Sequence, residues 1–185
     1  IIIALHWITF FEAIEQSNIS ITLAMFSTGA FFASLLEPIF FKRKIKPVEI
    51  ILGCVVVCGV FIILNANINS FVGVLLGIVS ALLASLFSVF NGKLVQNNNP
   101  FLISFYEFLS GVVFILLYLI FSDNLSDLAI SSFFSYDYLY VFILGSICTA
   151  YAFIGSVHVM RYLTPFTVML TYNLEPVYGI ILALL

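Results

Sequence analysis

The stretch FVGVLLGIVSALLASLFSVFNGKLV, residues 71–95, decides the fold of this chain. Its one charged residue is Lys93, close to its end, so a helix of this length can cross the roughly 30 Å hydrocarbon core of a bilayer. Small residues recur at every third or fourth position, namely Gly73, Gly77, Ala81, Ala84, Ser85, Ser88 and Gly92. Such a stripe lets helix backbones approach closely in lipid, and we expect it to pack inside one polypeptide rather than between two copies.

The whole chain has the composition of a membrane protein. Charged residues make up 8% of it, whereas soluble domains average roughly 25%. Hydrophobic residues reach 63%, with a mean hydropathy of +1.23, and a water-soluble fold of this length would leave large apolar patches exposed. The expected partner of this surface is therefore the lipid bilayer, and the sequence has no basic patch suited to nucleic acid.

Seven segments are apolar enough to be predicted as transmembrane helices, each of which needs about 20 residues. They are residues 1–16, 19–41, 47–64, 71–95, 100–121, 138–160 and 165–185. The predicted fold class is an all-α polytopic membrane protein. Because the chain begins and ends inside apolar runs, we expect it to be a fragment, with further spans outside it.

All six lysine and arginine residues fall in alternate gaps between these segments. The basic gaps are residues 42–46, 93–99 and 161–164, whereas the gap at 122–137 contains aspartates and no cation. Cytoplasmic loops of membrane proteins are enriched in lysine and arginine. We therefore predict a multi-pass protein of the cell membrane (inner or plasma) whose three basic loops are cytoplasmic.

The order of the helices indicates an internal repeat. An offset of about 146 residues places the first two predicted helices on the last two and aligns Asn18 with Thr164. Five spans separate the partners, and an odd number inverts the second copy in the membrane, as in many secondary transporters. Residues 36–38 (Leu-Glu-Pro) also recur at 174–176, but at a different distance from the helix start, so we interpret that match as coincidental.

Several stretches carry the sequence pattern of one transporter family. The most extensive is YLTPFTVMLTYNLEPVYG, residues 162–179, and the next is ICTAYAF, residues 147–153. Residues 73–93 and the pair Gly53 and Gly59 add to the pattern. In that order, these stretches resemble the ninth, eighth, sixth and fifth helices of the EamA-like branch of the drug/metabolite transporter superfamily.

The resemblance implies the organisation of the whole transporter. Members of this family have ten helices in two inverted five-helix halves, with both termini in the cytoplasm. The seven visible helices would then be helices three to nine. Residues 1–65 would be the C-terminal part of the first EamA repeat, and residues 71–185 the second repeat, truncated before its last helix.

Transport chemistry is expected from polar groups inside the spans, where an ionisable side chain costs about 2.5 to 3.5 kcal/mol on insertion scales. Glu175 lies about 15 Å from the start of its predicted helix, near the bilayer centre, and Pro176 removes a backbone donor beside it. We interpret Glu175 as a candidate for substrate binding or proton coupling. The alternative is a structural glutamate at a helix kink.

Further candidates for substrate binding or coupling also have structural alternatives. They are Asn173, Tyr172, Tyr151, Glu107, His6, Trp7 and Asn91. Glu107 could line a cavity or reach the cytoplasmic interface, and His6 suits either proton coupling or a hydrogen-bonded packing role. The tyrosines and asparagines could bind a substrate or pack in the core. The glutamates near the span ends are predicted to be interfacial, namely Glu12, Glu15, Glu37 and Glu49.

Secondary transport is the function that these patterns favour. The chain has no G-x-x-x-x-G-K-[ST] loop for nucleotide phosphates and no H-E-x-x-H motif, so we expect neither an ATP-driven pump nor an enzyme, and no cofactor or metal. Apart from Lys93, close to the end of residues 71–95, no lysine or arginine lies within a predicted span, which favours a neutral, zwitterionic or cationic metabolite, such as an amino acid. A seven-helix receptor or a membrane scaffold without transport activity is the alternative.

Overall fold

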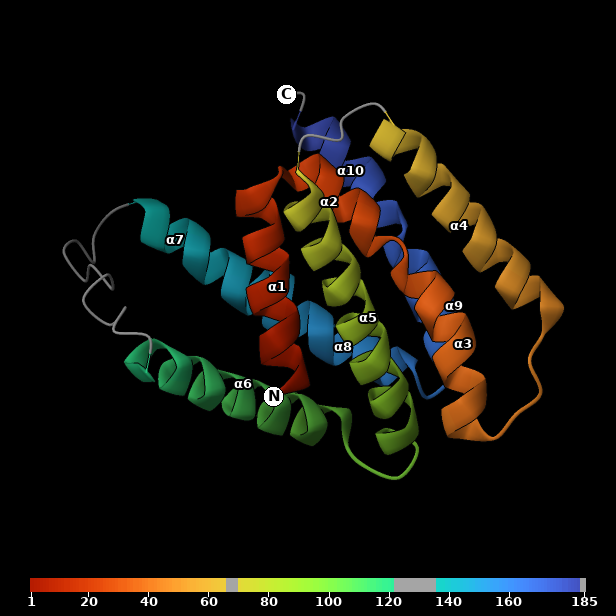
Figure 1. The fold of residues 1–185 in the computed structure, drawn as a ribbon. Helices are drawn as coiled ribbons and strands as arrows, with labels where there is room; N and C mark the ends of the chain where they lie inside the picture. The colour runs from red at the N-terminus through yellow and green to blue at the C-terminus, as the bar shows by residue number, and fades with distance from the viewer. Residues whose placement is uncertain (66–69, 122–135, 184–185) are drawn as a thin grey trace.

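The computed structural model describes residues 1–65, 70–121 and 136–183, and every regular element in these ranges is a helix (Figure 1). Helices occupy all seven predicted segments. They are α1 (Ile2–Gln16), α2 (Ile19–Phe26), α3 (Gly29–Phe41), α4 (Pro47–Asn65), α5 (Phe71–Leu94), α6 (Pro100–Phe121), α7 (Tyr136–Ile143), the π-helix η2 (Leu144–Tyr151), α8 (Ala152–Val159), α9 (Pro165–Tyr172) and α10 (Leu174–Ala183).

Among the described residues, four helical stretches are long and apolar enough to cross a bilayer, and they confirm the prediction of an all-helical, polytopic membrane protein. They are Ile19–Phe41, Phe71–Leu94, Pro100–Phe121 and Tyr138–Val159. By the same measure α1 is too short, with 15 residues, and α9 and α10 are separate helices of 8 and 10 residues. The count of seven spans therefore stays a prediction.

Helix α5 lies at the centre of the molecule and contacts α1, α2, α3, α8 and α9 (Figure 1). Its stripe of small residues is buried. A methyl group added at Gly77 would lie 2.7 Å from Cβ of Met25 in α2, and one at Gly92 would lie 2.5 Å from Cγ of Pro165. The stripe thus packs against helices of the same chain, as predicted.

Two of the predicted helices are interrupted, and their interruptions have the same form. Both α2 and α9 contain eight residues and end at a C-cap that keeps α-helical φ and ψ, Ser27 (φ −56°, ψ −25°) and Asn173 (φ −63°, ψ −7°), and Thr28 follows Ser27 before α3 begins. Each begins at a side-chain cap: Asn18 accepts a hydrogen bond from the N–H of Ile21, and Thr164 accepts one from Thr167. Residues 19 and 165, where the two helices begin, are separated by the offset of 146.

Different residues cause the two interruptions. The hydroxyl of Ser27 donates to the carbonyl of Leu23 at 3.2 Å, and that of Thr28 donates to the carbonyl of Met25 at 2.7 Å. Such bonds to the preceding turn bend helices. Between α9 and α10, Pro176 has no N–H to donate to the carbonyl of Tyr172, so the series of α-helical hydrogen bonds is broken there.

The two interrupted helices pack antiparallel to each other. Helix α2 contacts α10 and α3 contacts α9, so the first half of each lies against the second half of the other. A methyl group at Gly29, where α3 begins, would lie 2.5 Å from Cε of Met169. Phe26, Ala33 and Phe166 form one buried cluster with α5, and the crossing is therefore part of the core.

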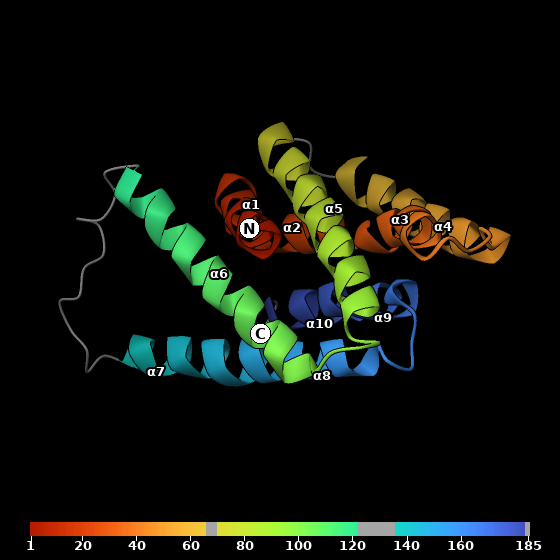
Figure 2. The ribbon, with the colours of Figure 1, turned by 90° about the horizontal axis from the view of Figure 1, so that it is seen from below.

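The three basic loops lie at the same end of the molecule (Figure 1). Arg161 joins two of them, donating from Nε to the carbonyl of Val95 at 3.2 Å and from Nη2 to that of Asn98 at 2.9 Å. Figure 2 shows that α6 begins beside α8 and runs obliquely away from the line of α7 and α8. Many large apolar side chains on these helices are exposed, as expected for a surface that faces lipid. Two of the three aspartates of the predicted non-cytoplasmic gap, Asp123 and Asp127, lie outside the described residues.

Candidate functional site

Three of the predicted site residues lie together at the second interruption. Tyr172 is the last residue of α9, Asn173 is its C-cap, and Glu175 is in the first turn of α10. The hydroxyl groups of Tyr172 and Ser156 form a hydrogen bond that ties α9 to α8. The Nδ2 atom of Asn173 is buried and has no hydrogen-bond partner among the described residues, whereas Glu175 is exposed. The interruption thus combines a carboxylate with an unused amide donor.

The first interruption brings backbone polar groups to the same crossing. The hydroxyl of Ser85 in α5 lies 2.7 Å from the carbonyl oxygen of Gly29 and 2.8 Å from that of Ala81, and its single proton can serve either. Sequence reasoning missed this interruption. The available signal was the run of two hydroxyl residues before a glycine, at positions 27–29.

His6 lies in the interface between α1 and α5. Its Nδ1 is 3.0 Å from the backbone carbonyl oxygen of Ser80 and 2.8 Å from the hydroxyl of the same residue, and the tautomer of the ring decides whether Nδ1 donates or accepts. The hydroxyl of Ser80 donates in return to the carbonyl of His6 at 3.2 Å. The imidazole also packs against the rings of Phe10, Phe26 and Phe87. These contacts give His6 a packing role, and they leave its role in coupling a prediction.

Trp7 also packs between helices. Its ring is stacked on that of Phe108 in α6, with centroids 5.8 Å apart and an interplanar angle of 15°. Phe108 in turn contacts Phe153 of α8. Trp7 therefore connects α1 to the pair α6 and α8, and the described contacts do not join it to Glu175.

Asn91 and Glu107 form a second polar group, between α5 and α6. The Nδ2 of Asn91 donates to Oε2 of Glu107 at 3.0 Å. Asn91 is 0% exposed, and its Oδ1 has no partner in the part of the chain that the structure describes. Glu107 lines a groove of about 480 Å³ beside the C-terminal end of α5. The sequence predicted both residues as site candidates, but only the packing of α6 brings them into contact.

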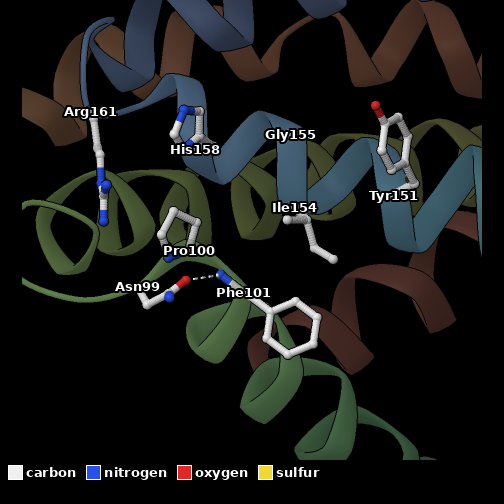
Figure 3. A pocket seen from close by; sticks show the side chains of 8 residues that line it. All are labelled: Asn99, Pro100, Phe101, Tyr151, Ile154, Gly155, His158 and Arg161. Atoms are coloured by element: carbon white, nitrogen blue, oxygen red, sulfur yellow. Dashed lines mark hydrogen bonds between the residues drawn. The ribbon is translucent and has the colours of Figure 1, made fainter.

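Tyr151 lies apart from these groups. It is 77% exposed and lines a shallow groove of about 430 Å³ with residues of α8 and the start of α6, including Ile154, His158 and Phe101 (Figure 3). Arg161 closes the end of this groove nearest the basic loops. The structure thus assigns Tyr151 to a different surface from Tyr172 and Asn173.

The side chain of Glu37, which the sequence predicts to be interfacial, is buried in the protein. It is 2% exposed, and its Oε1 accepts from Nε of Arg43 at 2.9 Å while its Oε2 accepts from the N–H of Phe166 at 2.7 Å. Phe166 is in the first turn of α9, where unpaired N–H groups and the helix dipole favour a carboxylate. Glu37 therefore fixes α3 to α9 at the basic end. The two bonded residues, Glu37 and Phe166, are 129 residues apart in sequence.

Arg43 extends this contact to α4. Its Nη2 donates to Oε2 of Glu49 at 2.5 Å, and Lys46 lies 3.6 Å from the other oxygen. Glu49 is 7% exposed, so it too is buried. Partial burial alone would lower the pKa of Arg43, but the hydrogen bonds and charges of Glu49 and Glu37 outweigh it and raise that pKa above its ordinary value. The guanidinium consequently stays charged.

Comparison with known proteins agrees with this membrane architecture. The chain is 22% identical over 184 residues to the uncharacterized transporter YxxF of Bacillus subtilis (strain 168), an alignment that covers 96% of this chain and 57% of that relative. No solved structure matches the chain. The model of the EamA-like transporter family matches residues 71–185, which is more than half of the chain. This multi-pass membrane protein therefore belongs to the EamA-like transporter family, a family of transporters and not of enzymes.

Proposed function

We propose that this chain is part of a secondary transporter that moves small metabolites across the cell membrane by alternating access. The observation that carries the proposal is the antiparallel crossing of two interrupted helices, α2–α3 and α9–α10. Secondary transporters commonly bind substrate near the membrane midplane where discontinuous helices of two repeats meet. Asn173, with its buried and unused Nδ2, and Glu175 are the proposed contacts of the substrate.

The proposal includes two inverted repeats, in residues 1–65 and 71–185. The matched caps, helix lengths and interruptions at an offset of 146 residues support it. Opening toward the basic end would separate α3 from α9 and break the bond between Glu37 and Phe166. We propose that this end is cytoplasmic, because five of the six cations lie in the loops gathered there and the sixth, Lys93, lies in the last turn of α5 beside them.

The substrate class follows from charge. Within the described helices, lysine and arginine occur only near an end, as Lys93 does in α5. A multiply charged anion would have no cationic partner at the crossing, whereas Glu175 suits an ammonium group. Neutral, zwitterionic or cationic metabolites, such as amino acids, are the proposed substrates, and sugar-phosphate exchange by the intact protein in proteoliposomes would overturn this assignment.

One comparison names the substrate and tests the site together. Cells that contain the full-length protein, cells that lack it and cells with Asn173→Leu are compared by untargeted metabolite analysis. We expect a small set of metabolites to change in abundance with the native protein and not with the variant. Equal metabolite profiles in native and variant cells, at equal membrane expression, would exclude Asn173 from the site.

Glu175 is tested for proton coupling separately. We expect Glu175→Gln to abolish uptake driven by a pH gradient while expression stays intact, because glutamine cannot bind and release a proton. The matched control is Glu15→Gln, since Glu15 is exposed at the end of α1. An unchanged pH dependence in Glu175→Gln would reject this role.

A further inference from the structure

Two carboxylates held in the helix packing have different partners. Glu37 is matched by the guanidinium of Arg43 and by a backbone N–H. Glu107 instead accepts a hydrogen bond from a neutral amide, that of Asn91, and it makes no ion pair with any described residue. A charged carboxylate inside a span is costly without a positive partner. Among the described residues, Glu107 therefore lacks a positively charged partner such as Arg43 provides for Glu37.

Asn91 adds a second unmet acceptor next to this carboxylate. Its Nδ2 is used by Glu107, and its Oδ1 is buried and accepts no hydrogen bond from the described residues. Buried polar atoms are nearly always satisfied, so an exception calls for a specific explanation. An amide oxygen and a carboxylate are both acceptors, and both suit a cation or a proton rather than an anion.

A groove connects Glu107 to the basic end of the molecule. It is about 480 Å³ in volume and is lined by Leu94 and Asn98 at one end and by Tyr106, Glu107 and Ser110 of α6. Glu107 is seven residues beyond Pro100, or about 10 Å into the helix. The groove therefore offers a short path between the level of the basic loops and Glu107.

We propose that Glu107 and Asn91 form a binding site for a monovalent cation, either a proton or Na⁺, reached from the basic end of the molecule. A proton would neutralise the carboxylate directly. Na⁺ would be shared by the carboxylate and by Oδ1 of Asn91 after rotation of the amide. The site deepens the proposed transport function, on which it rests, because the bound cation would be a second coupling ion beside the proton proposed at Glu175.

No charged group of the neighbouring described helices forms an ion pair with Glu107. From α1, the α-amino group of Ile1 acts on Glu107 electrostatically but lies beyond ion-pair distance. Lys93 of α5 and His158 of α8 are both exposed near the basic loops.

The test measures binding and not transport, so that it can fail independently of the proposed function. The purified full-length protein is treated with dicyclohexylcarbodiimide, which modifies protonated carboxyl groups in apolar surroundings, and the modified residues are mapped by mass spectrometry. We expect Glu107 to be labelled several-fold more at acidic than at alkaline pH. Glu37 is the internal control, since its pairing with Arg43 should keep it unlabelled.

Adding Na⁺ at constant pH distinguishes the two ions. A loss of labelling at Glu107 on adding Na⁺, but not on adding a bulky organic cation, identifies a Na⁺ site, and labelling that responds to pH alone identifies a proton site. In Asn91→Leu, labelling should persist to more alkaline pH, because the charged carboxylate loses its amide hydrogen bond. The proposal is overturned if Glu107 stays unlabelled at every pH, or is labelled equally at every pH and Na⁺ concentration.

Discussion

At the scale of single residues, Arg43 is the side chain on which the basic end depends most. It pairs with Glu37 and Glu49, both buried, so Arg43→Gln leaves two carboxylates without their cation. We expect a loss of about 3 to 5 kcal/mol of stability, as when one partner of a buried ion pair is removed. Lys46→Gln, which removes an exposed partner 3.6 Å from Glu49, should cost about 0 to 1 kcal/mol. Thermal unfolding of the purified variants measures both, and equal losses would contradict the burial of this network.

At the scale of helices, the small residues of α5 determine how closely its neighbours pack. In Gly77→Ala the new methyl group would lie 2.7 Å from Cβ of Met25, and overpacking of this kind costs about 1 to 3 kcal/mol. Gly59 in α4 has open space around it, so Gly59→Ala should be neutral or stabilising by up to about 1 kcal/mol. Unfolding temperatures in the same detergent compare the two variants. A Gly77→Ala protein as stable as Gly59→Ala would mean that α2 and α5 are not in close contact.

At the scale of the whole molecule, the placement of the cations predicts topology. Lys44 lies in the basic loop after α3. Gln16 lies where α1 ends, at the opposite end of the molecule. Single cysteines at these positions, in a cysteine-free background of the intact protein, should react with a membrane-impermeant maleimide from opposite sides of sealed vesicles. Labelling of both from one side would contradict the predicted orientation and the inverted repeat together.

The sequence by itself determined the membrane character, the helices and the family. Spans such as residues 71–94 are long and almost free of charge, and the physical cost of burying charge in hydrocarbon makes them readable without a structure. Local chemistry also placed the second interruption, because Pro176 acts on the backbone next to it. The first interruption was harder to predict, since hydroxyl groups that bond to their own helix do not always bend it.

Only the tertiary structure decided which polar side chains meet. Glu37 and Phe166 are 129 residues apart, and Asn91 meets Glu107 because of how α6 packs, not because of their spacing. The sequence treated Glu37 as interfacial from its distance to a loop, but burial depends on what covers a residue, and α9 covers this one. Long-range packing likewise separated Tyr151 from Tyr172, which had been grouped only by residue type. Hydropathy is a property of each segment, whereas a site is a property of segments brought together.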